Sequence, residues 1–334
     1  MEALDPLTGA LRRILDDLCT PALVRAAEAG GDTGALWRAL EAAGFADALC
    51  PEAAGGSGLG LSEAAALAQV CGACALPLPL SFTQVARAWL AAAGLPAPEG
   101  PVTLAGAPAR REAGEVRLAR VLWVPGSVAV LAEVEGVLRL LPLDRARVHA
   151  PGEGVLEADL AWAGADVADA PRLAPVDWRA TGACLLAAHV AGAAGRLLQD
   201  SLAHVRTRQQ FGRALGGFQA VQHQLALMAE EVAAARAAAH LGAAAGGLAA
   251  DPLRAAVAKA RTGEAALEVA SAAHALHGAL GITAEFHLQL FTRRLHAWRV
   301  AFGSESWWED RLGEALLTAG EAGGALAFVR ARVA

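Results

Sequence analysis

The sequence predicts an α+β fold that is mainly α, with a helical domain at residues 1–98, a small antiparallel β-domain at 99–174 and a four-helix bundle at 175–334. Two patterns predict it. Apolar residues recur at spacings of three and four in the outer parts, whereas the middle part alternates apolar and polar residues in short runs. Because helices and strands are segregated along the chain, a doubly wound parallel sheet is excluded. The 334 residues are 55% hydrophobic and 19% charged, which suffices for a large core.

The N-terminal part is predicted to contain three helices. The first carries an apolar stripe at Leu11, Ile14, Leu15 and Leu18. Asp32 is predicted to cap the second helix, and the third begins at Ser62. The uncharged run 64–86 is interrupted by Pro77 and Pro79, so it predicts a buried helix followed by a proline-rich connector and not a membrane span.

The middle part consists of short Val- and Leu-rich runs separated by glycine-containing turns, such as VRLARVLWV and VLEADLAWA. In the second of these runs, Leu156, Ala158, Leu160 and Trp162 share one face. Glu157 and Asp159 take the other face. The alternation predicts a sheet that packs one side against the helices.

The C-terminal part regains the helical spacing in longer segments, as from Phe218 to Ala235. Asp251 and Pro252 form an N-cap followed by a proline at the first helical position, and Gly278 is predicted to end that helix. Thr283 is predicted to open the fourth helix of the bundle.

Charge and cysteine usage narrow the class of partner. A formal net charge of -6 without a basic cluster argues against nucleic acid or a membrane surface, so a small molecule or another protein is expected. The acidic N-terminus has no apolar signal region, which predicts a cytoplasmic location. Five cysteines are an odd number, so reduced thiols are expected. Cys71 and Cys74 have redox spacing without the βαβ context, which favours buried structural residues.

The segment 205–231 is the candidate binding site. Arg206, Arg208 and Arg213 lie beside glycines at the start of a predicted helix, a combination that suits an anion such as pyrophosphate. A solvated loop between two helices explains the same residues. No metal site is predicted, since the histidines at 274 and 277 lack clustered acids or cysteines.

Three ordered motifs resemble the acyl-CoA dehydrogenase family. R-x-x-F-G followed by F-Q-x-x-Q resembles that family's flavin-contact segment, and the matching residues are Arg208, Phe211, Gly212, Phe218, Gln219 and Gln222. LWRALEAAGFADALCPEAAGGSGLGLSEAAAL resembles its N-terminal motif, and HGALGITAEFHLQLFTRR resembles its H-G-G-x-G segment. The resemblance covers nearly the whole chain.

The resemblance implies FAD as the cofactor, an acyl-CoA substrate and a dimer or dimer of dimers. It implies that Arg208 and Phe211 contact the ADP part of a flavin that a neighbouring subunit mainly holds, and that Gly212, Gln219 and Gly278 also bind the cofactor. The implied reaction is α,β-desaturation, in which a carboxylate removes the α-proton and the flavin accepts hydride from the β-carbon.

The expected catalytic base is missing from both positions that the family uses. Before the Gly-Ser of the terminal signature stands Phe302, and the alternative position on the preceding long helix is Gly182. Glu305 is a candidate for a relocated base, or an acid of a first helical turn. Asp177 is better explained as an N-cap.

Two of the family's flavin contacts also differ. The T-E-P segment that opens the family's β-domain corresponds here to the shorter PVTLAGAPARREAGEV, and Ala275 stands where a glutamine is usual. Trp123 lies near the flavin-flanking aromatic of the family, so it covers a flavin or belongs to the core.

Three functions fit this pattern. The first is a partner subunit that pairs with a complete paralogue in a heteromeric flavoenzyme. The second is a self-sufficient homo-oligomeric acyl-CoA dehydrogenase that uses Glu305 as its base. The third is a flavin-free protein that binds acyl-CoA or acts as a scaffold. The acyl chain and the electron acceptor stay open.

Overall fold

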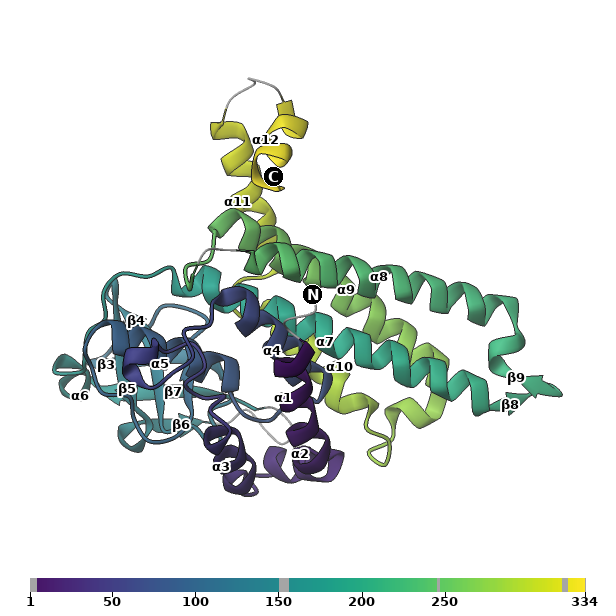
Figure 1. Ribbon diagram of the computed structural model, residues 1–334, viewed down its shortest axis with the longest axis horizontal. Helices are drawn as coiled ribbons and strands as arrows, with labels where there is room; N and C mark the ends of the chain where they lie inside the picture. Colours follow the sequence, from purple (N-terminus) through teal and green to yellow (C-terminus); the bar gives the residue numbers. More distant parts are fainter. Residues whose placement is uncertain (1–4, 150–155, 245–246, 320–323, 334) are drawn as a thin grey trace.

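The computed structural model describes residues 5–149, 156–244, 247–319 and 324–333. The strands of the middle part of the chain gather at the left side of the molecule, with the N-terminal helices beside them, and the long helices run away from them to the right (Figure 1). The predicted α+β fold with a C-terminal bundle is confirmed, and the elements follow the predicted order.

The N-terminal part has five helices within the described range: α1 Asp5–Leu18, α2 Pro21–Glu28, α3 Gly34–Ala42, α4 Leu61–Ala73 and α5 Leu80–Ala92. Two of them were not predicted. Helix α2 begins because the Thr20 hydroxyl accepts a hydrogen bond from the Leu23 amide at 3.2 Å, with Pro21 at the first helical position. Helix α5 replaces the predicted connector, since Pro79 takes the N-cap position where no amide hydrogen is needed.

The predicted cap of α3 was wrong by one residue. Thr33 takes the N-cap position, and Asp32 accepts a hydrogen bond from the Gly34 amide at 2.8 Å from just outside the helix. Helix α4 begins one residue before the predicted Ser62, after the N-cap Gly60.

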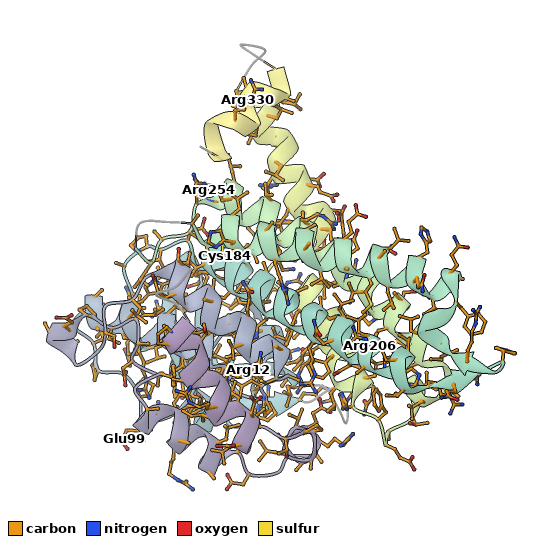
Figure 2. All side chains as sticks on the ribbon, turned by 45° about the vertical axis from the view of Figure 1, so that its right-hand side comes forward. Arg12, Glu99, Cys184, Arg206, Arg254 and Arg330 are labelled. Carbon is orange, nitrogen blue, oxygen red and sulfur yellow. The ribbon has the colours of Figure 1, made fainter. Side chains whose placement is uncertain are left out.

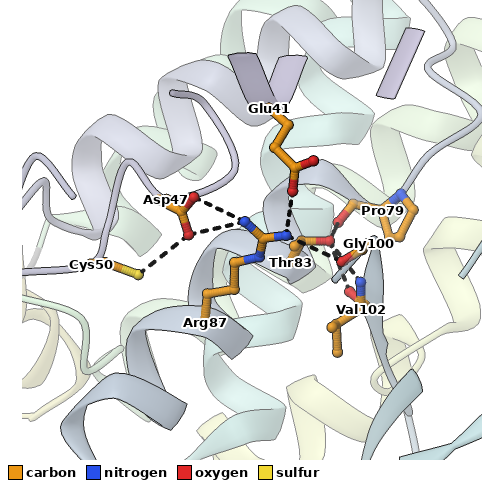
Figure 3. Close-up of polar contacts among 8 residues, drawn as sticks. All are labelled: Glu41, Asp47, Cys50, Pro79, Thr83, Arg87, Gly100 and Val102. Atoms are coloured by element: carbon orange, nitrogen blue, oxygen red, sulfur yellow. Dashed lines mark hydrogen bonds and ion pairs between the residues drawn. The ribbon is translucent and has the colours of Figure 1, made fainter. Parts of the chain in front are cut away.

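Helix α5 joins the N-terminal helices to the strands through buried polar groups (Figure 3). The guanidinium of Arg87 donates hydrogen bonds to Asp47 at 2.9 Å and 3.0 Å and to Glu41 at 2.7 Å. The Thr83 hydroxyl donates to the Val102 carbonyl at 3.1 Å and accepts from the Val102 amide at 3.0 Å. These bonds fix where the first strand starts relative to α5.

The described strands between β1 and β7 form two small sheets. The first has the order β1-β4-β5, and the second has the order β2-β3-β7-β6. Their bounds are β1 Val102–Leu104, β2 Arg110–Glu112, β3 Glu115–Leu122, β4 Ala129–Val134, β5 Val137–Pro142, β6 Arg147–His149 and β7 Glu157–Ala163. The pairs are antiparallel as predicted, except that β1 and β4 run parallel. Apolar residues of both sheets share one core, which includes Val116, Val130, Leu141, Leu160 and Trp162.

Strand β7 shows the predicted alternation with one exception. Ala158, Leu160 and Trp162 are buried and Asp159 is exposed. Glu157 is also buried, and an ion pair with Arg120 at 2.8 Å offsets the cost of burying its carboxylate. A short helix, α6 Gly164–Ala168, follows β7.

The bundle consists of α7 Trp178–Thr207, α8 Gln219–Ala243, α9 Pro252–His277 and α10 Leu288–Val300, followed by α11 Glu305–Thr318 and α12 Gly324–Val333. A two-stranded hairpin, β8 Gln209–Gln210 and β9 Arg213–Ala214, connects α7 to α8. Short 3-10 turns cover Glu52–Ala54, Leu143–Arg145, Leu215–Gly217 and Gly278–Ile282.

The predicted ends of α9 are confirmed. The Asp251 carboxylate accepts hydrogen bonds from two amides of the first turn, at 2.9 Å and 2.8 Å, and Gly278 follows the helix with a φ of 59°. The predicted start of the fourth helix was wrong, because α10 begins at Leu288 and not at Thr283. The Thr283 hydroxyl instead donates to the Leu280 carbonyl, so it closes the preceding turn.

Helix α7 is central to the bundle. It packs against α4, α8, α9 and α10. Among the described helices it is the one with the length and apolar composition of a membrane span, and 89% of its most apolar window is buried inside the protein. A buried core helix has the same composition, so its apolarity reflects packing on four sides.

Candidate functional site

Phe302 lies in the turn between α10 and α11, at the position that the resemblance assigns to the base. Its φ is 59°, an uncommon conformation for a residue with a side chain, and only 1% of the residue is exposed. The ring packs against Phe82 and Trp178, with centroid distances of 5.3 Å and 6.1 Å. The turn therefore points an apolar ring inward.

Further rings extend this packing into an aromatic cluster of Phe82, Trp123, Trp178, His189, Trp298 and Phe302. Within it, Trp123 lies 5.2 Å from Phe82, 5.3 Å from His189 and 5.7 Å from Trp298. The members come from α5, the segment after β3, α7, α10 and the turn that follows α10. All six are at least 95% buried, so their rings pack against one another and leave no substrate cavity between them.

Most polar atoms of this cluster form hydrogen bonds with neighbouring residues of the protein. His189 Nε2 and the Ser81 hydroxyl are 2.8 Å apart, and burial lowers the pKa of His189 to about 3. Trp123 Nε1 donates to the Leu76 carbonyl at 3.2 Å. Trp178 Nε1 donates to Glu133 at 2.9 Å. Trp123 was predicted either to cover a flavin or to belong to the core, and its surroundings match a core residue.

The two positions that could have carried a base lie against each other. A Cβ added to Gly182 would be 2.1 Å from Cε1 of Phe302, so the ring occupies the space above that glycine. A Cβ on Gly106 would be 3.0 Å from the Phe302 amide nitrogen. The β-domain and α7 thus close directly on Phe302.

Glu305 and Asp177 are engaged elsewhere. Both Glu305 oxygens accept hydrogen bonds from the Arg299 guanidinium, at 2.7 Å and 2.9 Å. Asp177 accepts a bond from the Ala180 amide at 2.8 Å, which confirms it as the N-cap of α7. Neither carboxylate lies in the aromatic cluster.

Lys259 is a residue of this region that sequence reasoning missed. Its ammonium donates to the carbonyls of Arg299 and Gly303 at 2.5 Å and 3.0 Å, and these carbonyls flank the Phe302 turn. Desolvation lowers the pKa of Lys259 to about 7. One feature of the sequence could have drawn attention to Lys259, because it is the only lysine among 28 basic residues.

The predicted flavin-contact residues gather at the other end of α7. Arg208 is exposed and caps the helix, and the hairpin then turns through Phe211 and Gly212 with φ values of 51° and 79°. Two consecutive positive φ values are typical of a tight two-residue hairpin loop. Phe211 is 87% exposed, and the neighbouring Arg206 lies at the same end of the bundle (Figure 2).

Adjacent residues make this end ordered and cationic. The Arg213 guanidinium lies 4.0 Å from the centroid of the Phe218 ring, and Gln222 donates to the Gly216 carbonyl at 2.9 Å. Gln219 is exposed at the first position of α8. The rings of His204 and His277 stack at 4.5 Å, which joins the ends of α7 and α9 and brings Gly278 to this end.

We compared both regions with the needs of FAD. The hairpin end offers exposed guanidinium groups, an exposed aromatic ring and glycine backbone, all of which suit the ADP part of a dinucleotide. The inner side of Phe302 leaves no room for a flavin ring, because Gly182 packs directly on that side chain, and the space beside Phe302 is a cleft of about 360 Å³ on its outer side. The hairpin end therefore has the groups that the ADP part of FAD would need.

Comparison with known proteins decides the family. The family model for the acyl-CoA dehydrogenase C-terminal domain matches residues 180–317. Acyl-CoA dehydrogenase IpdE2 of Mycobacterium tuberculosis is 35% identical over 286 residues, which cover 83% of this chain and 85% of that protein. This chain belongs to the acyl-CoA dehydrogenase family.

Solved structures of acyl-CoA dehydrogenases agree with this assignment. A Tcur3481-Tcur3483 steroid ACAD is 28% identical with a TM-score of 0.81, covering 95% of this chain and 98% of that one. The ChsE4-ChsE5 complex from Mycobacterium tuberculosis is 25% identical with a TM-score of 0.81, covering 96% and 99%. The family consists of flavoproteins of lipid metabolism, so oxidoreduction at CH–CH bonds and FAD are properties of the family as a whole.

Proposed function

We propose that this acyl-CoA dehydrogenase is the partner subunit of a heteromeric enzyme. It pairs with a complete paralogue, its hairpin end completes the FAD site of that paralogue, and its own aromatic cluster takes no part in catalysis. When bound, FAD supplies the acceptor for hydride from the β-carbon of an acyl-CoA. The proton transfer from the α-carbon then belongs to the paralogue.

The packing of Phe302 on Gly182 carries this proposal. Desaturation requires a group that accepts the α-proton, and a phenyl ring cannot accept one. His189 is neutral and fully buried, and both oxygens of Glu305 are bound to Arg299. The homo-oligomeric enzyme with Glu305 as its base therefore has less support.

The distance between the two regions supports action in trans. Helix α7 separates Gly182 from Arg208, and a rise of 1.5 Å per residue places these residues roughly 40 Å apart. The hairpin cannot reach the Phe302 region of its own chain. Arg208, Phe211, Gly212, Gln219 and Gly278 would therefore hold the ADP part of a cofactor whose reactive ring lies in another subunit.

The relatives add support of a different kind. Both solved structures above are named as two-component proteins, Tcur3481-Tcur3483 and ChsE4-ChsE5. A chain of this fold with only half of an FAD site is the expected component of such a pair. A paralogue at this end would cover the ring of Phe211, which is 87% exposed in this chain.

The test is co-expression with acyl-CoA dehydrogenase paralogues from neighbouring reading frames, followed by measurement of bound FAD and desaturation. We expect a yellow complex with one FAD for every two chains, whereas this chain alone is colourless and inactive. Arg208→Gln should lower FAD retention by the complex about tenfold, because one charge-assisted contact is lost. Arg38→Gln, an exposed arginine of α3, is the matched control.

Each alternative predicts a different result. Stoichiometric FAD and desaturation by this chain alone would overturn the proposal in favour of the homo-oligomeric enzyme. A colourless chain that binds acyl-CoA but forms no flavin-containing complex with any paralogue would instead favour the scaffold.

A further inference from the structure

A pocket with a volume of about 820 Å³ opens at the edge of the β-domain. Its walls come from the segment before β1, the loop between β3 and β4, the end of β5 with the turn after it, and strand β6. No member of the aromatic cluster and no residue of the hairpin is among the described residues that line it. Glu99, which does line it, and Arg206 of the hairpin end are widely separated in Figure 2. The pocket is therefore separate from both regions described above, and its volume is in the range of small-molecule sites.

Val148 in β6 shows that the pocket is an apolar space which the protein leaves unfilled. It lies opposite Leu160 of β7 in the register, so the two side chains are on the same face of the sheet. Leu160 is packed in the core and is 1% exposed, whereas Val148 is 52% exposed. Val128, from the loop between β3 and β4, is a second exposed apolar residue of the wall, at 39%. Exposed apolar residues around a hollow are typical of a binding site.

The polar groups of the wall are largely satisfied within the protein. The Val128 amide donates a hydrogen bond to the Pro101 carbonyl at 2.9 Å, and the Val128 carbonyl accepts one from the Leu143 amide at 3.0 Å. The Ser127 hydroxyl donates to the Trp123 carbonyl at 2.6 Å. Four further lining residues are prolines, which have no amide hydrogen: Pro98, Pro125, Pro142 and Pro171. The wall therefore offers few free donors, so the body of a ligand held here is apolar.

Glu99 and Asp144 give the pocket a negative charge. Glu99 precedes β1, and Asp144 stands in the turn that follows β5. Both residues are exposed, and neither forms a hydrogen bond or an ion pair with another described residue. The lining residues that the structure describes include no arginine, lysine or histidine. Because unpaired carboxylates attract a cation and repel an anion, this pocket disfavours FAD and acyl-CoA, both of which carry phosphates.

We infer that this pocket binds a small amphiphilic cation, an organic amine with a compact apolar body. The body fills the space beside Val128 and Val148, and the ammonium group pairs with Glu99 and Asp144 at the rim. This inference goes beyond the proposed function, because it concerns a ligand other than FAD or acyl-CoA and does not require the paralogue.

The probe is 1-adamantylamine, whose rigid body loses little conformational entropy on binding. Calorimetric titration of the full chain at low ionic strength, where screening is weak, should give a dissociation constant of about 1 mM or lower. Adamantane-1-carboxylate has the same body with the opposite charge, and tert-butylamine has the same charge with a much smaller body. Each should bind at least about tenfold more weakly. Absence of 1-adamantylamine binding, or equal binding of the amine and the carboxylate, would overturn the inference.

Two matched double variants locate the site. Glu99→Gln combined with Asp144→Asn should weaken 1-adamantylamine binding by about tenfold or more. Glu309→Gln combined with Asp310→Asn should leave it unchanged, because these exposed acids of α11 carry the same charge but do not line the pocket. Circular dichroism checks that both proteins fold. Wild-type affinity in the first double variant contradicts the inference, whatever the outcome of the FAD measurements.

Discussion

At position 302 the side chain is a buried apolar ring, and the neighbours of that ring fit its shape. Gly182 and Gly106 leave room for it, and Phe82 and Trp178 contact its faces or edges. The ring and its neighbours are therefore complementary in shape. A carboxylate at this position would not by itself create space for substrate and flavin.

Phe302→Glu should accordingly leave the chain without desaturase activity. A carboxylate at this fully buried position has no described partner, so the free energy of unfolding should fall by about 3–5 kcal/mol. Urea unfolding and a dye-linked acyl-CoA assay measure the two effects. Phe302→Leu, which adds no charge, is the control and should cost less. Gain of activity at unchanged stability would show that the base was the single obstacle.

Lys259 makes the stability of the chain depend on pH. Its pKa is about 7 in the folded protein and 10.5 in the reference state, so the unfolded chain binds more protons between these values. Stability should rise with pH across that window, by up to about 1.4 kcal/mol per pH unit. Below pH 7 the lysine is protonated in both states, and this dependence ends.

Comparison with Lys259→Met isolates this effect, because the cysteines and other titrating groups are common to both proteins. Urea midpoints at pH 7, 8 and 9 should rise for the wild type relative to the variant. Parallel pH curves for the two proteins would show that Lys259 keeps its proton throughout.

At the scale of elements, α7 owes its close packing to glycines at positions where a methyl group would collide. Gly182→Ala should destabilise the chain by about 1–3 kcal/mol, although alanine favours a helix. Combining it with Phe302→Ala should recover part of that loss, since the collision is removed. Chemical denaturation of the single and double variants measures the coupling.

Gly313→Ala in α11 is the matched control, because an added Cβ there meets no atom within 4 Å. This change should be neutral or stabilise the chain by about 1 kcal/mol. If Gly182→Ala behaved in the same way, the contact between α7 and the Phe302 ring would have to be looser than described.

In the proposed function, the β8–β9 hairpin contacts the FAD of another subunit. Phe211→Ser should leave the unfolding free energy within about 0.5 kcal/mol of the wild type, because the side chain is 87% exposed. The same change should reduce FAD retention by the heteromeric complex. Leu317→Ser, on a residue that is 82% exposed in α11, is the control and should retain FAD. Equal FAD retention in both variants would remove Phe211 from the cofactor site.

At the scale of the whole molecule, α7 separates two regions of opposite character. Near its start the aromatic cluster is closed and dry, and at its end the hairpin is exposed and cationic. The proposed function assigns the FAD contact to the hairpin end alone.

The order of the elements and the family could be read from the sequence, because periodicity, caps and motifs are local properties. The caps at Asp177 and Asp251 were recognised from two or three residues each. Helix α5 was missed since its neighbouring prolines indicate a connector, whereas tertiary burial makes the segment after Pro79 helical.

By itself the sequence placed Phe302 and Gly182 at the two positions where a base was expected, and it contains the R-x-x-F-G segment. Only the tertiary structure showed that these two residues touch. It also showed that Arg299 donates hydrogen bonds to Glu305 and that Lys259 donates to the Gly303 carbonyl in the turn. The physical reason is that Gly182 and Phe302 lie 120 positions apart in the chain, and their contact depends on how α7, α9 and α10 pack. Local sequence patterns do not specify such long-range packing, so the contact between Phe302 and Gly182 could be seen only in the folded molecule.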